Sequence, residues 1–421
     1  MKLGVVGMGY VGIPEAVLFA GLPDFEIVYG FQRESDTSGY KIKLLNEGKL
    51  PFQEEDLEIA LEESIKNHKF VCTSDYSKLS ECNTIIVAVQ TPPDLKAFFE
   101  AVDIISNSVS EELSPLVVVV STVPPGTIAK IKEKFNGKNI RVTHAPERVM
   151  PKKLIYNLQT LPRIIGGDCK EDINATVDLY RKIYVSDFIR MSCIEAEITK
   201  TSENAIRAVQ IAVANQIAVV CENNGANFFK VKEGIDSLKG KGITRALLLP
   251  GAGVGGHCLT KDGYLLMRNE RESPDIFSDA IFINNLMPYH MWQLTKNALR
   301  EHTTKSIGES RVLVFGWSYL PNTSDDRDSP SASFKRLAER EGCSVIIHDP
   351  LCGYDNINEI IRVDAIVIMT MHDIFEDIIK LLPNSEYPYP KILIDGRNVV
   401  ANPNKLIKAG WVYKAIGRGD L

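Results

Sequence analysis

The residues with the clearest chemical potential lie in a glycine-rich stretch past the middle of the chain. Residues 249–262 read LPGAGVGGHCLTKD, and the four glycines at 251, 253, 255 and 256 allow a backbone to wrap closely around a ligand. Cys258 follows them, and Asp262 stands four residues later, so the two would share a face if a helix began at the cysteine. A thiol at a helix N-terminus is a good nucleophile, which makes Cys258 a candidate catalytic residue. The alternative is a buried cysteine in a structural turn.

A second chemical motif stands at the N-terminus, where residues 7–12 read GMGYVG between an apolar run and a helix-like segment. In such a pattern Gly7 permits a tight turn, Gly9 lets the backbone approach a pyrophosphate, and Gly12 lets helix and strand pack closely. The helix N-terminus then faces the phosphates. The motif predicts dinucleotide binding at Gly7, Gly9, Tyr10, Val11 and Gly12, and the alternative is a glycine-rich turn without a ligand.

One position departs from this dinucleotide pattern. An acidic residue is expected about 20 residues further on, where it would bind the ribose hydroxyls. Gln32 and Arg33 occupy that place. Because an arginine can pair with a 2′-phosphate, the cofactor preference stays open between NAD and NADP, and Arg33 is otherwise a solvated surface charge.

The elements that must position these residues alternate between strands and helices in two separate regions. Short apolar runs at residues 2–6, 26–31, 84–89 and 116–121 predict a parallel, doubly wound sheet that extends to about residue 190. Residues 194–222 contain no Gly or Pro and predict a helix about 40 Å long, with more helix at 278–300. Strand-like runs return at 311–315, 344–348, 365–370 and 391–394. The expected fold is α/β: two doubly wound, Rossmann-like domains (1–190 and 305–421) joined by a helical middle domain (191–304) with a long central helix.

Composition limits the class of protein. A formal net charge of −6 over 421 residues argues against a broad nucleic-acid-binding surface. No uninterrupted apolar run is long enough to span a bilayer, and the N-terminus enters directly into a motif, so we expect a cytoplasmic enzyme without a membrane partner. The eight cysteines are scattered without a CxxC pair, which is typical of reduced thiols and predicts no metal site.

Motifs along nearly the whole chain resemble, in order, those of the UDP-glucose/GDP-mannose dehydrogenases, the nucleotide-sugar 6-dehydrogenases. The matching segments are GMGYVG (7–12), TP (91–92), STVPPGT (121–127), PERVMP (146–151), AEITK (196–200) with Asn204, GGHC (255–258) with Asp262, Asp325, Arg327, Ser329 and Pro330, and DGRN (395–398). So many ordered matches are very unlikely by chance.

The resemblance implies a nicotinamide-binding domain, a helical dimerising domain and a domain that holds the nucleotide diphosphate. It also implies a homodimer or higher homo-oligomer, a UDP-sugar substrate and two successive oxidations that use two NAD. The alcohol becomes an aldehyde, which Cys258 captures as a thiohemiacetal; a second oxidation gives a thioester, and water releases the carboxylate.

The residue chemistry suits that path. Lys200 and Asn204 would stabilise the oxyanion from one helix face, although Lys200 alone is more often a solvated charge. Asp262 could act as the base for water, Glu147 could orient or activate groups, and Thr122 could bind a water near the cofactor. The remaining contacts implied for the cofactor are Gln32, Arg33, Thr91, Thr122 and Arg327, and those for the substrate are Arg148, Lys200, Asn204, Gly253, Gly255, His257, Tyr319 and Arg397.

Two departures from the family pattern bear on the substrate. Leu320 follows Tyr319 where the family usually carries a lysine, so one nucleotide contact is missing. Pro151 stands where UDP-glucose enzymes usually carry a second glutamate, which favours a UDP-N-acetylhexosamine. We expect UDP-N-acetylmannosamine first, with the N-acetylglucosamine and N-acetylgalactosamine forms and UDP-glucose as alternatives. Arg148 or His257 would donate to the acetyl carbonyl, or else anchor its loop.

Two other classes of protein remain as alternatives. A single-step β-hydroxyacid dehydrogenase would share the N-terminal domain and the long helix but would lack the cysteine loop. A non-catalytic nucleotide-binding protein would be expected to have lost some of Lys200, Asn204, Cys258 and Asp262, and all four are present.

Overall fold

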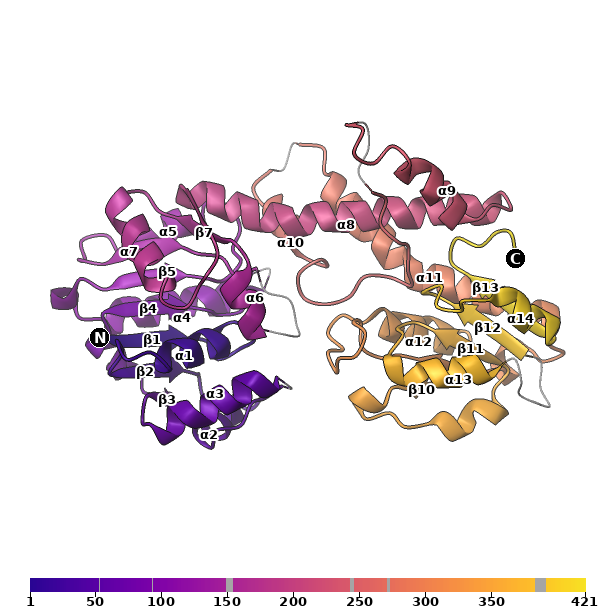
Figure 1. Cartoon of the computed structure of the whole chain (residues 1–421), viewed down its shortest axis with the longest axis horizontal. Helices are drawn as coiled ribbons and strands as arrows, with labels where there is room; N and C mark the ends of the chain where they lie inside the picture. Colours follow the sequence, from indigo (N-terminus) through magenta and orange to yellow (C-terminus); the bar gives the residue numbers. More distant parts are fainter. Residues whose placement is uncertain (53, 93, 149–153, 243–245, 271–272, 383–390) are drawn as a thin grey trace. The chain divides into compact units, whose positions relative to one another are not determined.

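The structure is a computed structural model, and it describes residues 1–421 except 53, 93, 149–153, 243–245, 271–272 and 383–390. The chain divides into two compact units, Met1–Ser202 and Glu203–Leu421 (Figure 1). Each unit is built around one parallel sheet.

The N-terminal unit holds an eight-stranded sheet in the order β3-β2-β1-β4-β5-β6-β7-β8. Its strands are β1 (Lys2–Val6), β2 (Ile27–Phe31), β3 (Phe70–Thr73), β4 (Thr84–Val87), β5 (Leu116–Val119), β6 (Arg141–His144), β7 (Arg163–Gly166) and β8 (Phe188–Met191). The order reverses between β1 and β4, where a doubly wound sheet binds its ligands. The predicted strands lie within one or two residues of those observed, because buried parallel strands read as continuous apolar runs.

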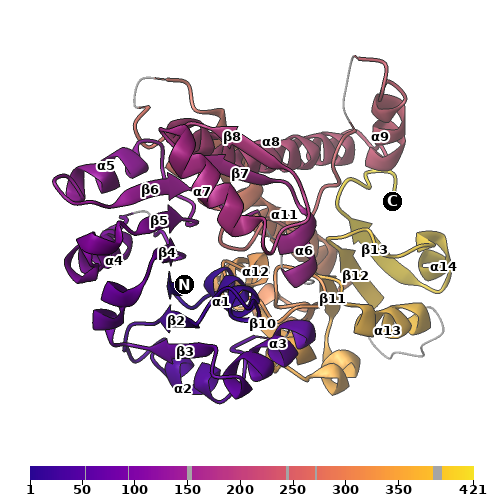
Figure 2. The ribbon, with the colours of Figure 1, turned by 60° about the vertical axis from the view of Figure 1, so that its left-hand side comes forward.

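Helices cover both faces of this sheet, as a doubly wound fold requires. They are α1 (Gly12–Ala20), α2 (Tyr40–Asn46), α3 (Glu55–Lys66), α4 (Lys96–Ser108), α5 (Thr127–Lys134), α6 (Leu154–Thr160) and α7 (Lys170–Tyr180). One hydrophobic core joins the sheet to α1, α3, α6 and α7, and another joins its opposite face to α4 and α5. Figure 2 shows α4 and α5 on one side of the strands and α1, α6 and α7 on the other.

The outer strands β7 and β8 depart from the simple pattern. They pair in parallel with each other, but β7 meets β6 only through one antiparallel bridge between Gly166 and His144. The sequence analysis did not predict these two strands. Neither RIIG (163–166) nor FIRM (188–191) contains a continuous apolar run as long as those of β4 and β5.

The long helix α8 (Cys193–Asn223) confirms the predicted central helix and runs across the boundary between the units. Averaged over an 18-residue window, α8 is also apolar enough, by length and composition alone, to cross a membrane, a test that core helices of soluble proteins also pass. This does not contradict the expectation from the sequence, which concerned uninterrupted apolar runs, because Arg207, Gln210 and Asn215 interrupt α8. Asn215 of α8 is 1% exposed and donates to Asn284 of α11 at 3.0 Å, a buried helix–helix contact.

The C-terminal unit holds a five-stranded, fully parallel sheet in the order β10-β9-β11-β12-β13. Its strands are β9 (Arg311–Phe315), β10 (Ser344–His348), β11 (Ala365–Ile368), β12 (Lys391–Asp395) and β13 (Trp411–Ala415), and its helices are α9 (Phe228–Asp236), α10 (Asp262–Leu266), α11 (Ile276–His302), α12 (Pro330–Arg340), α13 (Glu376–Leu381) and α14 (Pro403–Lys408). Helices α8, α11 and α12 pack on one face, and α13 and α14 on the other. The order reverses between β9 and β11, so this sheet has its own ligand-binding edge.

Candidate active site

The N-terminal glycine turn between β1 and α1 has the shape that a dinucleotide requires. Gly7 adopts φ +102°, and a Cβ there would lie 2.6 Å from the carbonyl oxygen of Ala88, the residue that follows β4. A Cβ on Gly12 would lie 1.9 Å from the Gly7 carbonyl oxygen. Gly9 has no atom within 4 Å of its Cβ position, which leaves room for a phosphate to approach the backbone. The residues present therefore fit NAD.

Gln32 and Arg33 lie at the end of β2, where the ribose-binding acid usually stands. The Gln32 Oε1 accepts from the Met8 amide at 3.3 Å, so this side chain braces the glycine turn. The exposed Arg33 forms an ion pair with Glu100 of α4 at 3.1 Å. Lys41, which the sequence analysis did not single out, donates to the Met8 carbonyl at 3.0 Å and places a cation beside the same turn.

Other predicted residues gather at the carboxyl edge of the same sheet. Thr91 follows β4 and is buried, and Thr122 follows β5 and is half-buried. Glu147 and Arg148 follow β6; the Arg148 amide donates to Glu147 Oε1 at 2.7 Å, and Arg148 Nη1 donates to the Pro162 carbonyl at 3.0 Å. The Arg148 contact favours the loop-anchoring interpretation. Pro151 lies outside the described residues.

The start of α8 contributes Lys200 to the N-terminal unit, where it is 9% exposed and not a solvated surface charge. The positive charges of Arg163 and Lys200 add to burial in lowering the pKa of His144, at the end of β6, to about 4, so Lys200 lies near the carboxyl edge of the sheet. Glu197, one turn earlier, accepts from the amides of Gly126 at 2.8 Å and Ile128 at 2.7 Å and so caps α5. Glu197 thus fixes the first turns of α8 against α5, and with them the position of Lys200.

In the C-terminal unit, the cysteine loop lies against the chain that follows β9. A Cβ on Gly255 would lie 2.5 Å from the Tyr319 Cβ, and one on Gly256 would lie 2.7 Å from the Tyr319 ring. The Gly256 amide donates to the Arg327 carbonyl at 2.9 Å. A Cβ on Gly253, which has φ +126°, would lie 3.0 Å from Pro330. Close approach therefore requires glycine at all three positions, and a positive φ requires it also at Gly253 and Gly256.

Arg397 supports the beginning of the same loop. Its Nη1 would lie 2.5 Å from a Cβ on Gly251, and its Nε donates to the Met369 carbonyl at 2.7 Å. Burial lowers the pKa of Arg397 to about 10, so the guanidinium remains charged at neutral pH. A half-buried positive charge beside a glycine loop suits a phosphate.

Cys258 is exposed at the end of the glycine loop, whereas Asp262 is 0% exposed. The Asp262 carboxylate accepts from Asn204 Nδ2 at 2.6 Å and pairs with Lys261 Nζ at 2.9 Å. Asn204 and Asp262, to which the sequence analysis gave separate roles, are thus in direct contact. The sequence analysis missed Lys261, which adjoins Asp262 in the chain and supplies a cation to it.

The condition under which Cys258 and Asp262 would share a helix face, a helix that begins at Cys258, is not met. Helix α10 begins at Asp262 and has only five residues, although the Asp262 amide does donate to the Cys258 carbonyl at 2.9 Å. The preceding glycines carry the backbone through a tight turn first, so Cys258 lies one turn before the helix. Its exposure distinguishes it from Cys72, Cys82, Cys193 and Cys343, because burial raises the pKa of those four thiols to about 12.

Two more predicted residues lie close to the cysteine loop. Burial lowers the pKa of His257, so the ring is neutral near pH 7 and can donate one hydrogen bond. Arg327 pairs with both oxygens of Asp325, at 2.8 Å and 2.6 Å, and this same carboxylate accepts from the Tyr319 hydroxyl at 3.2 Å. Asp325 therefore holds two proposed binding residues together.

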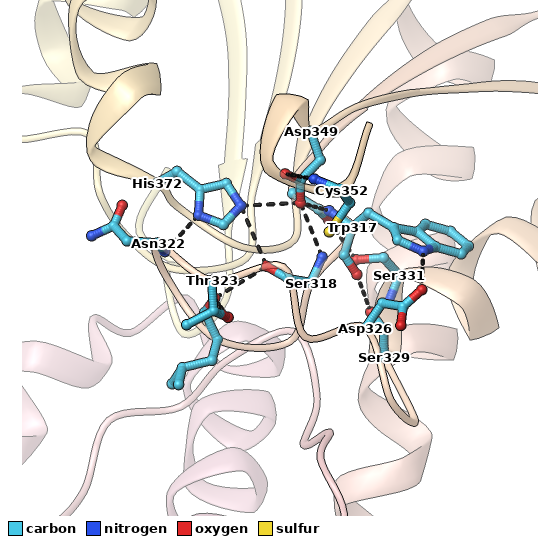
Figure 3. A network of polar contacts seen from close by, with 12 residues as sticks. Trp317, Ser318, Asn322, Thr323, Asp326, Ser329, Ser331, Asp349, Cys352 and His372 are labelled. Carbon is cyan, nitrogen blue, oxygen red and sulfur yellow. Dashed lines mark hydrogen bonds and ion pairs between the residues drawn. The ribbon is translucent and has the colours of Figure 1, made fainter. Parts of the chain in front are cut away.

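A buried histidine and aspartate organise the chain after β9 (Figure 3). Asp349 accepts from the Trp317 and Ser318 amides at 2.7 and 3.0 Å, and His372 Nε2 lies 3.0 Å from the same carboxylate. The Asn322 amide donates to His372 Nδ1 at 2.7 Å, which fixes the orientation of the ring. Burial alone would raise the pKa of Asp349, but these hydrogen bonds outweigh it and hold the pKa at about 2.

The N-terminal sheet and its glycine turn define a dinucleotide-binding protein, and the second parallel-sheet unit has its own ligand-binding edge. Three domain profiles match in order: the NAD binding domain of the UDP-glucose/GDP-mannose dehydrogenase family over residues 1–184, its central domain over 194–285 and its UDP binding domain over 313–402. The chain belongs to the UDP-glucose/GDP-mannose dehydrogenase family. It is accordingly an oxidoreductase that uses NAD on nucleotide sugars.

Individual relatives cover the whole chain. It is 32% identical to UDP-N-acetyl-D-mannosamine dehydrogenase of Pyrococcus horikoshii, over 100% of both chains, and the solved structure of that protein matches with a TM-score of 0.89. The structure of NDP-N-acetyl-D-galactosaminuronic acid dehydrogenase from Methanosarcina mazei is 40% identical, covers 100% of this chain and 96% of that one, and gives a TM-score of 0.84. A UDP-glucose dehydrogenase from Pyrobaculum islandicum is 25% identical, over 99% and 97% of the two chains, with a TM-score of 0.83.

Proposed function

We propose that this enzyme oxidises the 6-hydroxyl of a UDP-N-acetylhexosamine to a carboxylate, with UDP-N-acetylmannosamine as the preferred substrate and UDP-N-acetylmannosaminuronate as the product. The observation that carries this proposal is the exposed Cys258 on a glycine loop, four residues before a buried Asp262 that is bound to Asn204. An aldehyde held on a thiol can be oxidised a second time without leaving the enzyme, and the resulting thioester can be hydrolysed.

The roles of the catalytic residues follow from their chemistry. Cys258 is the nucleophile, and Lys200 with Asn204 stabilises the oxyanion on the reacting carbon. Asp262 and Glu147 are the carboxylates that activate water, and Thr122 holds a water near the cofactor. When bound, NAD accepts hydride in both oxidations.

The proposed binding residues fall into two sets. The cofactor is held by Gly7, Gly9, Tyr10, Val11, Gly12, Gln32, Arg33, Thr91, Thr122 and Arg327. The substrate is held by Arg148, Lys200, Asn204, Gly253, Gly255, His257, Tyr319 and Arg397. Support for the second set comes from the packing of Tyr319 and Arg397 against the glycine loop.

The identity of the sugar depends on small differences. The Pyrococcus relative is named for N-acetylmannosamine, which supports our first choice, while the Methanosarcina relative is named for N-acetylgalactosaminuronic acid and makes UDP-N-acetylgalactosamine the second candidate. We propose His257, neutral and half-buried beside Cys258, as the donor to an acetamido carbonyl, whereas Arg148 donates to the Pro162 carbonyl and anchors its loop.

The experiment is a steady-state kcat/KM measurement with NAD for the UDP derivatives of N-acetylmannosamine, N-acetylgalactosamine, N-acetylglucosamine and glucose. We expect the first to give the highest value. A tenfold advantage for UDP-glucose over every N-acetylated sugar, about 1.4 kcal/mol, would refute the assignment. Replacing His257 by Ala should lower kcat/KM for the N-acetylated sugars more than for UDP-glucose.

The nucleophile is tested separately. The Cys258→Ala variant should form no carboxylate while binding NAD nearly as well as the wild type, because Cys258 is not among the cofactor-binding residues. Cys169, the other exposed cysteine, is the matched control: Cys169→Ala should keep normal turnover. Near-native acid formation by the Cys258→Ala variant would contradict the thioester route.

We further propose a homodimer or higher homo-oligomer, formed through the middle of a three-part chain (1–190, 191–304 and 305–421). Ile206, Val213 and Val220 are exposed seven residues apart on α8, and Phe282, Leu286 and Tyr289 are exposed on α11. Apolar side chains with this spacing form a stripe that a second copy can cover. A monomeric mass in light scattering at micromolar concentration would refute the assembly. Consistent with its soluble substrates, the enzyme is proposed to act in the cytoplasm.

A further inference from the structure

A cluster of buried charged side chains adjoins Glu147 in the N-terminal unit. Arg163, the first residue of β7, is 2% exposed and pairs with two carboxylates. Its Nη2 lies 2.7 Å from Oε1 of Glu15, and its Nη1 lies 2.6 Å from Oε2 of Glu147. Glu15 belongs to α1 and is 0% exposed. The proposed function uses Glu147 but assigns nothing to the other two residues.

Two tyrosines complete the cluster in a matched arrangement. The Tyr180 hydroxyl donates to Glu15 Oε2 at 3.0 Å, and the Tyr184 hydroxyl donates to Glu147 Oε2 at 3.0 Å. The Arg163 guanidinium carbon lies 3.8 Å from the centre of the Tyr180 ring and 4.9 Å from that of Tyr184. Each carboxylate therefore has its own phenol, and the two carboxylates share one guanidinium.

The charges of the cluster do not balance when both carboxylates are ionised. One guanidinium and two carboxylates leave one negative charge in a buried place, which is costly. Burial raises the pKa of Glu15 to about 7, although the charge of Arg163 opposes this. The groups that face Glu15 are Arg163 from β7, Tyr180 from α7 and Glu147 from the chain after β6. Below neutral pH Glu15 holds a proton, and Arg163 can pair fully with Glu147.

We propose that Arg163 is the positioning residue for Glu147 during hydrolysis of the covalent intermediate, and that Glu15, by competing for the same guanidinium, controls how strongly Arg163 pairs with Glu147. This inference rests on the proposed function. In that step a water oxygen bonds to the acyl carbon, the carbon–sulfur bond breaks, the sulfur leaves as the Cys258 thiolate, and the proton of the water passes to Glu147. Because α1 follows the dinucleotide turn directly, the cluster also ties that turn to the loop that carries Glu147.

The two tyrosines offer a matched pair of variants. Tyr184→Phe and Tyr180→Phe each remove one hydroxyl and keep the ring on Arg163. The first removes the contact to Glu147 and the hydrogen bond that this hydroxyl accepts from Arg163 Nη1, whereas the second removes the contact to Glu15. In rapid-mixing experiments Tyr184→Phe, and likewise Arg163→Lys, should slow hydrolysis at least about tenfold while the NADH burst changes little. The acyl group should then accumulate on Cys258 and be detected by intact-protein mass. Tyr180→Phe should hydrolyse at a rate much closer to that of the wild type.

The role of Glu15 is tested by a pH profile. The wild-type hydrolysis rate should fall as the pH rises, with a midpoint near pH 7, because Glu15 ionises there and begins to compete with Glu147 for Arg163. This falling part of the profile is the limb to be tested. Glu15→Gln keeps an oxygen acceptor for Arg163 but cannot ionise, so this limb should disappear. A limb that persists in Glu15→Gln would overturn the role of Glu15.

Failure of this inference differs from failure of the proposed function. If the wild type produces no NADH burst with any UDP-sugar, the proposed function is wrong. If the wild type turns over but Tyr184→Phe and Tyr180→Phe slow the burst and the hydrolysis to the same extent, the cluster only stabilises the fold, and the positioning role is refuted.

Discussion

The contact between Gly256 and Tyr319 allows one prediction to be worked out from distances. A Cβ at Gly256 would lie 2.7 Å from the Tyr319 ring, about 0.7 Å inside the 3.4 Å at which ordinary contact begins. The ring cannot easily withdraw, because the Tyr319 hydroxyl donates to the Asp325 carboxylate at 3.2 Å and the Tyr319 backbone amide donates to the Asp325 carbonyl at 3.1 Å. In Gly256→Ala the loop must therefore move instead, and it carries Cys258 two residues further on.

The expected loss of activity is large compared with the loss of stability. A displacement approaching 1 Å at a reacting group costs up to about 100-fold in rate. A non-glycine residue at positive φ costs about 1–2 kcal/mol in folding free energy. We expect Gly256→Ala to lower kcat between about tenfold and 100-fold while lowering the free energy of unfolding by little more than the backbone term.

Gly240 supplies the matched control, since its φ of +78° resembles the +81° of Gly256 but no atom lies within 4 Å of its Cβ position. Gly240→Ala should carry the same backbone cost and keep normal turnover. The assays are NADH formation at saturating substrate and urea unfolding. Equal turnover in the two variants would show that Tyr319 does not fix the position of the nucleophile loop.

Three further predictions concern the cofactor, acid stability and the support of the loop. The NAD over NADP preference in kcat/KM should stay below about a thousandfold, near 4 kcal/mol, and Glu100→Gln should improve NADP use by releasing Arg33 from an anionic neighbour; a larger ratio would contradict this. Asp349→Asn should destabilise the protein by about 1–2 kcal/mol at pH 7. The folded pKa of Asp349 is about 2 against an ordinary 3.8, so its contribution to stability is present above about pH 4 and is lost as the pH falls through 2. A difference in unfolding midpoint between wild type and variant that stayed constant down to pH 2 would refute this. Asn215→Ala should lower the unfolding free energy by about 2–3 kcal/mol, since the glycine-loop amide at 2.9 Å and Asn284 at 3.0 Å both lose their partner; a urea midpoint equal to that of the wild type would contradict this.

The sequence predicted those features that depend on local pattern. The α/β class, the strand at Lys2–Val6 and the limits of α8 follow from apolar runs and from a stretch without Gly or Pro. The contact between Asn204 and Asp262 joins residues 58 apart in the chain; the family pattern singled out both residues, but it did not predict that they touch.

Other features depend on contacts that no local pattern contains. The ion pair between Arg163 and Glu15 joins residues 148 apart, and neither residue stands in a recognisable motif of charged groups. The packing of Tyr319 on the glycine loop likewise depends on where the fold places the segment that follows β9. The short helix α10 was not predicted, and it begins at Asp262 and not at Cys258. Long-range side-chain contacts are therefore what the structure adds.

The capping of α5 by Glu197 has a practical consequence for dissecting the chain. Strand β8 ends at Met191, so a fragment cut at residue 192 would look complete by its sheet, yet it would lack the carboxylate that satisfies the Gly126 and Ile128 amides. A fragment ending at Ser202 would retain Glu197 together with the buried Ala196 and Thr201. The boundary of an autonomously folding dinucleotide-binding fragment thus lies inside the long helix, about three turns beyond the last strand.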